Sequence, residues 1–186
     1  MNRRNLFAGL SGAAILPLAI QFGPGAALAQ PASPRAPTTP IGGDDYKRMT
    51  LVVGTLAKQT SELAAQKASS AKVKQFAGFE VAEQTAIAQT LTSQQNPPNP
   101  TLDDKRAAVL KELQGVSGAN FDKAYIKAQI DGHSELLGIQ DAFLKGKGQD
   151  SASILASDTA HVATIAKAVI EMHLAMLKDL NDTVSG

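Results

Sequence analysis

The chain has 186 residues, of which 44% are hydrophobic and 19% charged, and it contains neither cysteine nor tryptophan. This composition excludes a disordered polymer, a disulfide scaffold and thiol chemistry. Lysine and arginine number 18 against 17 acidic residues, and aromatic residues make up only 4%. So balanced a charge and so few aromatic rings give no basis for binding a nucleic acid or an anionic membrane surface. We therefore expect no nucleic-acid partner.

Residues 1–29 have the three parts of an export signal. Arg3 and Arg4 precede an apolar stretch, and the segment closes with Ala-Leu-Ala, a small-residue cleavage pattern. The stretch is interrupted by proline and is too short for a spanning helix, which needs about 20 apolar residues. We predict cleavage between Ala29 and Gln30. The remaining chain would carry 16 basic and 17 acidic residues, a net charge of −1.

The paired arginines resemble a twin-arginine signal, although the usual Phe-Leu order is reversed at Leu6-Phe7. General secretory signals also hold two arginines, so the export route stays open. The expected partner is the export machinery, and the expected location is the periplasm, with association with the outer membrane as one alternative. We expect no transmembrane segment in the mature chain. Residues 30–43 carry a proline at every third position from Pro31 to Pro40, which favours an extended, disordered linker.

The placement of proline indicates that the rest of the chain is helical. No proline occurs from Ile41 to Asn96 or after Pro100, and alanine is frequent throughout. Apolar spacing predicts five helices inside a domain at 44–182, namely 44–67, 71–93, 102–113, 121–145 and 152–180. The connection between the second and fourth helices is long and contains the short one. This pattern predicts an all-α, ferritin-like four-helix bundle with a short extra connecting helix.

Two details of these helices are also predicted. Thr101 and Asn120 are the expected N-caps of the third and fourth helices. In the last helix, apolar residues at spacings of three and four predict the side that faces the core. These residues are Val162, Ile165, Val169, Met172, Met176 and Leu180.

Several motifs resemble the bacterial family called domain of unknown function 4142. The most specific is VSGANFDKAYIKAQIDGH, which contains Tyr125, Gln129 and His133. Asp45-Tyr46, Gly54 and the Val73–Ala77 segment also fit, and His173-Leu174 is similar to the family's last histidine. The resemblance covers roughly Asp45 to Leu180. It implies an exported, ferritin-like helical bundle, often labelled an outer-membrane protein, and it implies no activity.

The chain departs from the family pattern at positions that matter for metal binding. The family usually has a glutamate where this chain has Ala57, and Asp-His where it has Glu83-Gln84. A methionine is usual in place of Glu80. Two side chains of a type that could bind metal are thus missing.

Some polar residues fall on faces that should be apolar. Glu80 and Gln84 lie one turn apart within the apolar face of the second helix, and His133 lies within that of the fourth. Because a buried carboxylate needs a partner, we expect a core polar cluster of Glu80, Gln84, His133, His173 and Tyr125. No catalytic residue is predicted. No cofactor is predicted either, but a transition metal at Glu80 and His133 is an open alternative.

The hairpin of the last two long helices decides which histidine can join His133. With its turn at Gly148–Gln149, His173 would lie roughly 12 Å further along the axis than His133. This register predicts that His173 lies beside Tyr125, and that the two histidines cannot bind one ion.

The first functional interpretation is an exported, non-enzymatic bundle with a structural, stress-related or small-ligand role. The alternative is a ferritin-like metal-binding or redox protein with a degenerate site. Enzymatic activity is left undecided, with the residues favouring none. The physiological role, the ligand and the oligomeric state are not predicted.

Overall fold

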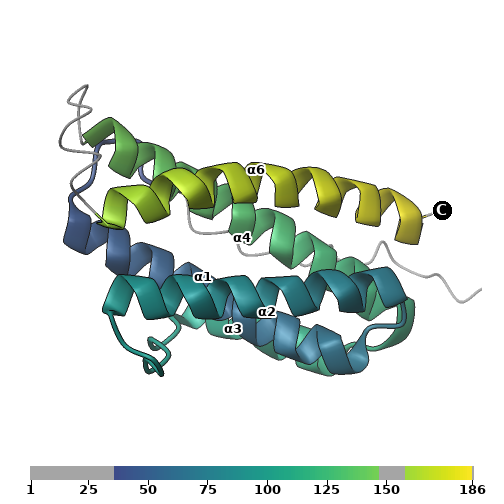
Figure 1. Cartoon of the computed structure of the whole chain (residues 1–186). Coiled ribbons are helices and arrows are strands. Elements are labelled where there is room, and N and C mark those ends of the chain that lie inside the picture. The colour runs from purple at the N-terminus through teal and green to yellow at the C-terminus, as the bar shows by residue number, and fades with distance from the viewer. Residues whose placement is uncertain (1–35, 147–157, 186) are drawn as a thin grey trace, which may run out of the picture. The chain divides into compact units, whose positions relative to one another are not determined.

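Helices make up most of the part of the chain that the computed structural model describes, residues 36–146 and 158–185 (Figure 1). They are α1 (Gly43–Lys67), α2 (Ala71–Thr92), α3 (Asp104–Gly115), α4 (Gly118–Gly146) and α6 (Asp158–Ser185). These two ranges contain no strand, so the predicted all-α bundle is confirmed. The predicted export signal, residues 30–35 of the linker and residues 152–157 of the last predicted helix lie outside the described residues.

The helix ends show why two predicted caps are wrong. The N-cap of α3 is Asp103, whose carboxylate accepts a hydrogen bond from the Arg106 backbone N–H at 2.9 Å, and Thr101 lies outside the helix. α4 begins at Gly118, whose φ of 62° is open to glycine at little cost. Asn120 therefore lies inside the first turn of α4 and does not cap it.

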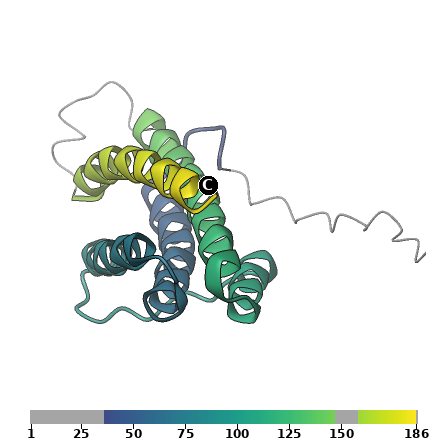
Figure 2. The same cartoon turned by 90° about the vertical axis from the view of Figure 1, so that its right-hand side faces the viewer.

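The long helices are connected as a ferritin-like bundle with a crossover. α1 packs against both α2 and α4, α4 packs along α6, and α2 makes a thinner contact with α6. Figure 2 shows α6 beside α4. The chain therefore leaves α2 and crosses to the far side of α1 before α4 begins, with α3 packed against α1 and α4 on the way. This is the long connection that the sequence predicts.

The core consists of two apolar clusters along the bundle. The first contains Phe76 of α2, Tyr125 and Ile126 of α4 and Leu177 of α6. The second, nearer the other end of the same helices, includes Leu91, Leu136, Ile139, Phe143 and Ile170. Between the two clusters, each of these three helices contributes a polar residue. These residues are Glu80, His133 and His173, and all three are buried.

The buried face of α6 differs from the predicted one. Small residues, Ala160, Ala163 and Ala166, are buried together with Ile170, Leu177 and Leu180. Ile165 and Met172 are 67% and 53% exposed, so placing them in the core was wrong. The alanines allow α6 to lie against the large side chains of α4, such as Leu136 and Phe143, which fill the space between the helices.

Part of α6 is also apolar enough to be compared with a membrane span. An 18-residue stretch inside Asp158–Val184 is long and apolar enough to cross a membrane. Helices in the core of soluble proteins meet the same criterion, and one face of α6 belongs to the bundle core. The expected absence of a transmembrane segment in the mature chain remains a prediction.

Candidate metal centre

Three buried side chains meet in the polar layer between the two apolar clusters. Glu80 of α2 and His133 of α4 are fully buried, and His173 of α6 is 4% exposed. Oε2 of Glu80 lies 3.3 Å from Nε2 of His133 and 3.3 Å from Nδ1 of His173. The two imidazole nitrogens lie 3.2 Å from each other. These three atoms thus form a nearly equilateral triangle.

The size of this triangle matches a metal coordination shell. Tetrahedral zinc binds histidine nitrogen and carboxylate oxygen at about 2.0–2.2 Å, which places neighbouring ligand atoms roughly 3.3 Å apart. The three measured separations are 3.2, 3.3 and 3.3 Å. One ion could therefore contact all three atoms without any large movement of the helices. Glu80, His133 and His173 also form a group whose potential ligand atoms lie within 4.8 Å of one another.

Each of the three side chains has an outer partner that orients it. Nδ1 of His133 lies 2.8 Å from the backbone carbonyl of Gln129. Because a carbonyl oxygen can only accept, Nδ1 must carry the hydrogen, and in the neutral ring Nε2 then presents its lone pair to Glu80 and His173. Histidine ligands of metals commonly donate their second ring N–H in this way.

The other two side chains are held similarly. The Gln84 amide Nε2 donates to Oε1 of Glu80 at 3.0 Å, which leaves Oε2 for the centre. Nε2 of His173 lies 3.5 Å from Oε2 of Glu83, on the ring edge away from Glu80. At many metal sites, a carboxylate accepts a hydrogen bond from a histidine whose other ring nitrogen binds the ion. Glu83 is thus placed to orient His173. The sequence pattern did not suggest this role, because Glu83 lies outside the apolar face of α2.

The electrostatics of the cluster favour a positive charge at its centre. Burial alone would raise the pKa of Glu80, but hydrogen bonds and charges from the two histidines outweigh it and lower the pKa to about 2. Burial would lower the pKa of His133, but the hydrogen bond and charge of Glu80 outweigh it and raise the pKa above the usual 6.5. The Glu80 carboxylate thus stays ionised, and either a protonated imidazole or a metal cation balances its charge.

The contact between the two histidines contradicts the predicted register of the hairpin. Their rings lie 5.3 Å apart between centroids, so the predicted axial offset of roughly 12 Å is wrong. His133 lies 13 residues before the end of α4 at Gly146, and His173 lies 15 residues after Asp158 begins α6. The two histidines are thus nearly level along the α4–α6 pair.

Tyr125 lies one layer away from the triangle. Its hydroxyl forms a hydrogen bond of 2.7 Å with Ser61 of α1, and burial raises its pKa above the usual value. Gln129 extends this second network, donating through its amide to Thr60 and Ser61. Sequence reasoning did not identify Thr60 and Ser61 as partners, because their contact with Gln129 depends on how α1 packs against α4. Gln129 could have been found, since it lies one helical turn before His133.

The fold and the site together define an all-α bundle with a buried carboxylate–histidine centre. The chain matches the family described as Domain of unknown function (DUF4142) over residues 30–180, and it belongs to this family. No curated protein and no solved structure was found that matches the chain.

Proposed function

We propose that this protein binds one divalent transition-metal ion through Glu80, His133 and His173. The observation that carries the proposal is the triangle of three buried ligand atoms, each 3.2–3.3 Å from the other two. Imidazole with carboxylate suits zinc, iron, copper and nickel, and the chain has no cysteine to supply a softer ligand. Of the two sequence-based interpretations, this geometry favours the metal-binding alternative over a purely structural bundle.

Binding at this centre would exchange protons for the ion. In the metal-free protein, the raised pKa of His133 favours the imidazolium, whose Nδ1 donates to Gln129 and whose Nε2 proton faces Glu80. A divalent ion would displace that proton and take the lone pairs of all three atoms. Metal affinity should therefore rise with pH, as histidine ligands lose their protons.

The ligand set favours one ion in a site buried from solvent. Di-iron bundles draw a glutamate from each of two helices and a Glu-x-x-His pair from each of two others. Here Glu80 is the carboxylate in the triangle, and Ala57 of α1 is a small buried residue with no metal-binding group. Exposures of 0–4% suit retention of an ion more than turnover of a large substrate. We therefore propose a non-enzymatic, metal-binding role.

We also propose that the chain is exported to the periplasm. The support is the signal-like pattern of residues 1–29, with Arg3 and Arg4 at its start, and the family match, which begins at residue 30. N-terminal sequencing of the exported protein should then begin at Gln30. A chain that retains Met1 in the periplasmic fraction would contradict this proposal.

Metal binding can be tested on the purified, chelator-treated protein. Titration with Zn²⁺, followed by calorimetry, should give one ion per chain. Co²⁺ should produce the intense visible absorption of a tetrahedral site. At a free zinc concentration about 100 times the Kd, the free energy of unfolding should rise by about 2.7 kcal/mol.

The chain provides a matched control for this experiment. His173→Gln should abolish stoichiometric binding and the zinc-induced stabilisation, because it removes one corner of the triangle. His161→Gln makes the same change at an exposed histidine of the same helix and should leave both unchanged. Substoichiometric binding by the unmodified protein, or equal losses in the two variants, would rule out the proposed centre.

A further inference from the structure

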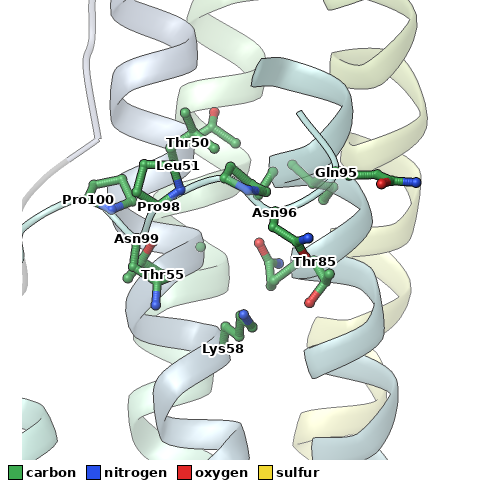
Figure 3. A pocket seen from close by; sticks show the side chains of 15 residues that line it. Thr50, Leu51, Thr55, Lys58, Thr85, Gln95, Asn96, Pro98, Asn99 and Pro100 are labelled. Carbon is green, nitrogen blue, oxygen red and sulfur yellow. The ribbon is translucent and has the colours of Figure 1, made fainter. Parts of the chain in front are cut away.

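A polar cavity lies against the outer side of Gln84, next to the proposed metal centre. It is enclosed by α1, α2 and the segment Gln95–Pro100 and has a volume of about 130 Å³ (Figure 3). Lys58 lies at its lower edge in Figure 3, with Asn96 and Asn99 above. The Gln95–Pro100 segment therefore covers a space between α1 and α2 that would otherwise be open to solvent.

The lining of this cavity is suited to a negative charge. Lys58 is the one charged residue among the side chains that line it, and no aspartate or glutamate contributes. The Lys58 ammonium has an acidic neighbour in Glu62, but at 3.7 Å and in a pair whose side chains are 26% and 48% exposed to solvent. Such exposed pairs contribute little, so the ammonium can exchange Glu62 for an anion in the cavity. Amide groups of Asn96 and Asn99 supply further hydrogen-bond donors.

The remaining walls of the cavity are apolar. They are formed by Leu51, Ile87 and Ala88 and by Pro97, Pro98 and Pro100. A cavity of about 150 Å³ can hold a six-carbon ring, so a volume of 130 Å³ fits about six non-hydrogen atoms. A ligand with one anionic end and a short carbon chain would match both kinds of wall.

Gln84 connects this cavity to Glu80. The residue is 4% exposed, lines the cavity, and donates through Nε2 to Oε1 of Glu80 at 3.0 Å. Its Oε1 lies against Gly54, where a Cβ atom would approach it to 2.4 Å. The amide is thus fixed between the cavity and the carboxylate, so a ligand that moves it also moves a proposed metal ligand.

We propose that this cavity binds a short-chain carboxylate, with Lys58 pairing with the carboxylate group. The bound ligand moves the Gln84 amide, and this movement changes the position of Glu80. The binding step is independent of the metal, whereas the effect on Glu80 rests on the proposed metal-binding function. By reciprocity, a carboxylate that changes metal affinity must have its own affinity changed by the metal by the same factor.

The experiment compares three probes of similar size on the metal-free, full-length protein. Butyrate, butyramide and butylammonium are titrated separately while amide resonances are followed by NMR. Butyrate should shift resonances of Lys58, Asn96 and the Gln84 side-chain amide, and it should bind at least about tenfold more tightly than the other two. Equal affinities for butyrate and butyramide, or shifts that map elsewhere, would overturn the proposal.

Two variants and a second titration complete the test. Lys58→Met keeps most of the aliphatic stem but removes the charge, and should weaken butyrate binding about tenfold or more. Lys74→Met makes the same change at an exposed residue outside the cavity and should have no effect. Unchanged butyrate affinity in Lys58→Met would overturn the site. Loss of zinc binding with butyrate binding intact would instead refute only the metal centre.

Discussion

Gly54 is the residue where the smallest change should perturb the proposed centre. A Cβ atom at this position would lie 2.4 Å from Oε1 of Gln84, so Gly54→Ala must displace the amide that orients Glu80. We expect a loss of about 1–3 kcal/mol in the free energy of unfolding, typical of overpacking in a core. Zinc affinity should fall as well, which calorimetry on the folded variant would measure.

Gly78→Ala is the control for this change. Gly78 also lies inside a helix, α2, but a Cβ atom there would meet nothing within 4 Å. Because alanine is the better helix former, the variant should gain roughly 0.5–1 kcal/mol and bind zinc normally. If the two alanine variants had the same stability, the close packing of Gln84 against α1 would be wrong.

At this scale, the sequence indicated which polar residues would be buried but not how they are arranged. Glu80, Gln84 and His133 stand out because each interrupts an apolar face, a signal that one helix carries by itself. The contact of His173 with His133 depends on where the α4–α6 hairpin turns, and helical periodicity does not determine that position. Glu83 was missed because its role depends on a histidine from α6.

Among the elements, α3 is held to α4 by a buried ion pair. Arg106 of α3 pairs with Glu135 of α4, and the two residues are 8% and 7% exposed. Burial raises the pKa of Glu135, an effect that outweighs the nearby Arg106 guanidinium. Ionisation of the buried Glu135 carboxylate therefore costs free energy. Removing one partner leaves a buried, uncompensated charge, whereas removing both need not destabilise the protein.

A double-mutant cycle on this pair should show the asymmetry. Arg106→Met alone should reduce the free energy of unfolding by about 3–5 kcal/mol, and the double variant with Glu135→Leu should recover most of that loss. Chemical denaturation of the four proteins provides the measurement. Losses that simply add in the double variant would mean that the two charges do not interact.

The same substitution at two positions of α6 tests which of its faces is buried. Ile170 is 2% exposed and Ile165 is 67% exposed. Ile170→Ala should cost about 2–5 kcal/mol in thermal or chemical unfolding, as expected for a buried isoleucine. Ile165→Ala should change stability by no more than about 0.5 kcal/mol. The reverse order would restore the face that the sequence pattern predicted.

The helices themselves were predictable, but the packing face of α6 was not. Proline placement and apolar spacing located four helices to within a few residues, and the long second connection correctly indicated the crossover. For α6, spacing of the large apolar residues selected Val162, Ile165 and Val169. The buried face instead contains alanines, because large side chains of the facing helix α4 fill the space between the two helices. A pattern confined to one helix does not show how large its neighbour's side chains are.

Across the whole molecule, the proposed ion would join three helices, two of which, α2 and α6, pack against each other over a small contact. α2 and α6 make a thin contact, and Glu80, Glu83 and His173 provide its polar part. An ion bound by Glu80, His133 and His173 would link α2, α4 and α6 directly. Metal binding should therefore suppress local opening between α2 and α6 more than opening elsewhere.

Hydrogen exchange followed by mass spectrometry would test this effect. Zinc should slow exchange in peptides that contain Glu80 or His173, while peptides of α3, which lies outside the centre, should change little. In His173→Gln, zinc should have no such effect, because the link from α6 is lost. Uniform slowing in every helix would indicate only global stabilisation. Slowing confined to α3 or to the Gln95–Pro100 segment would place the ion elsewhere, since only a ligand that bridges α2, α4 and α6 can restrict these helices selectively.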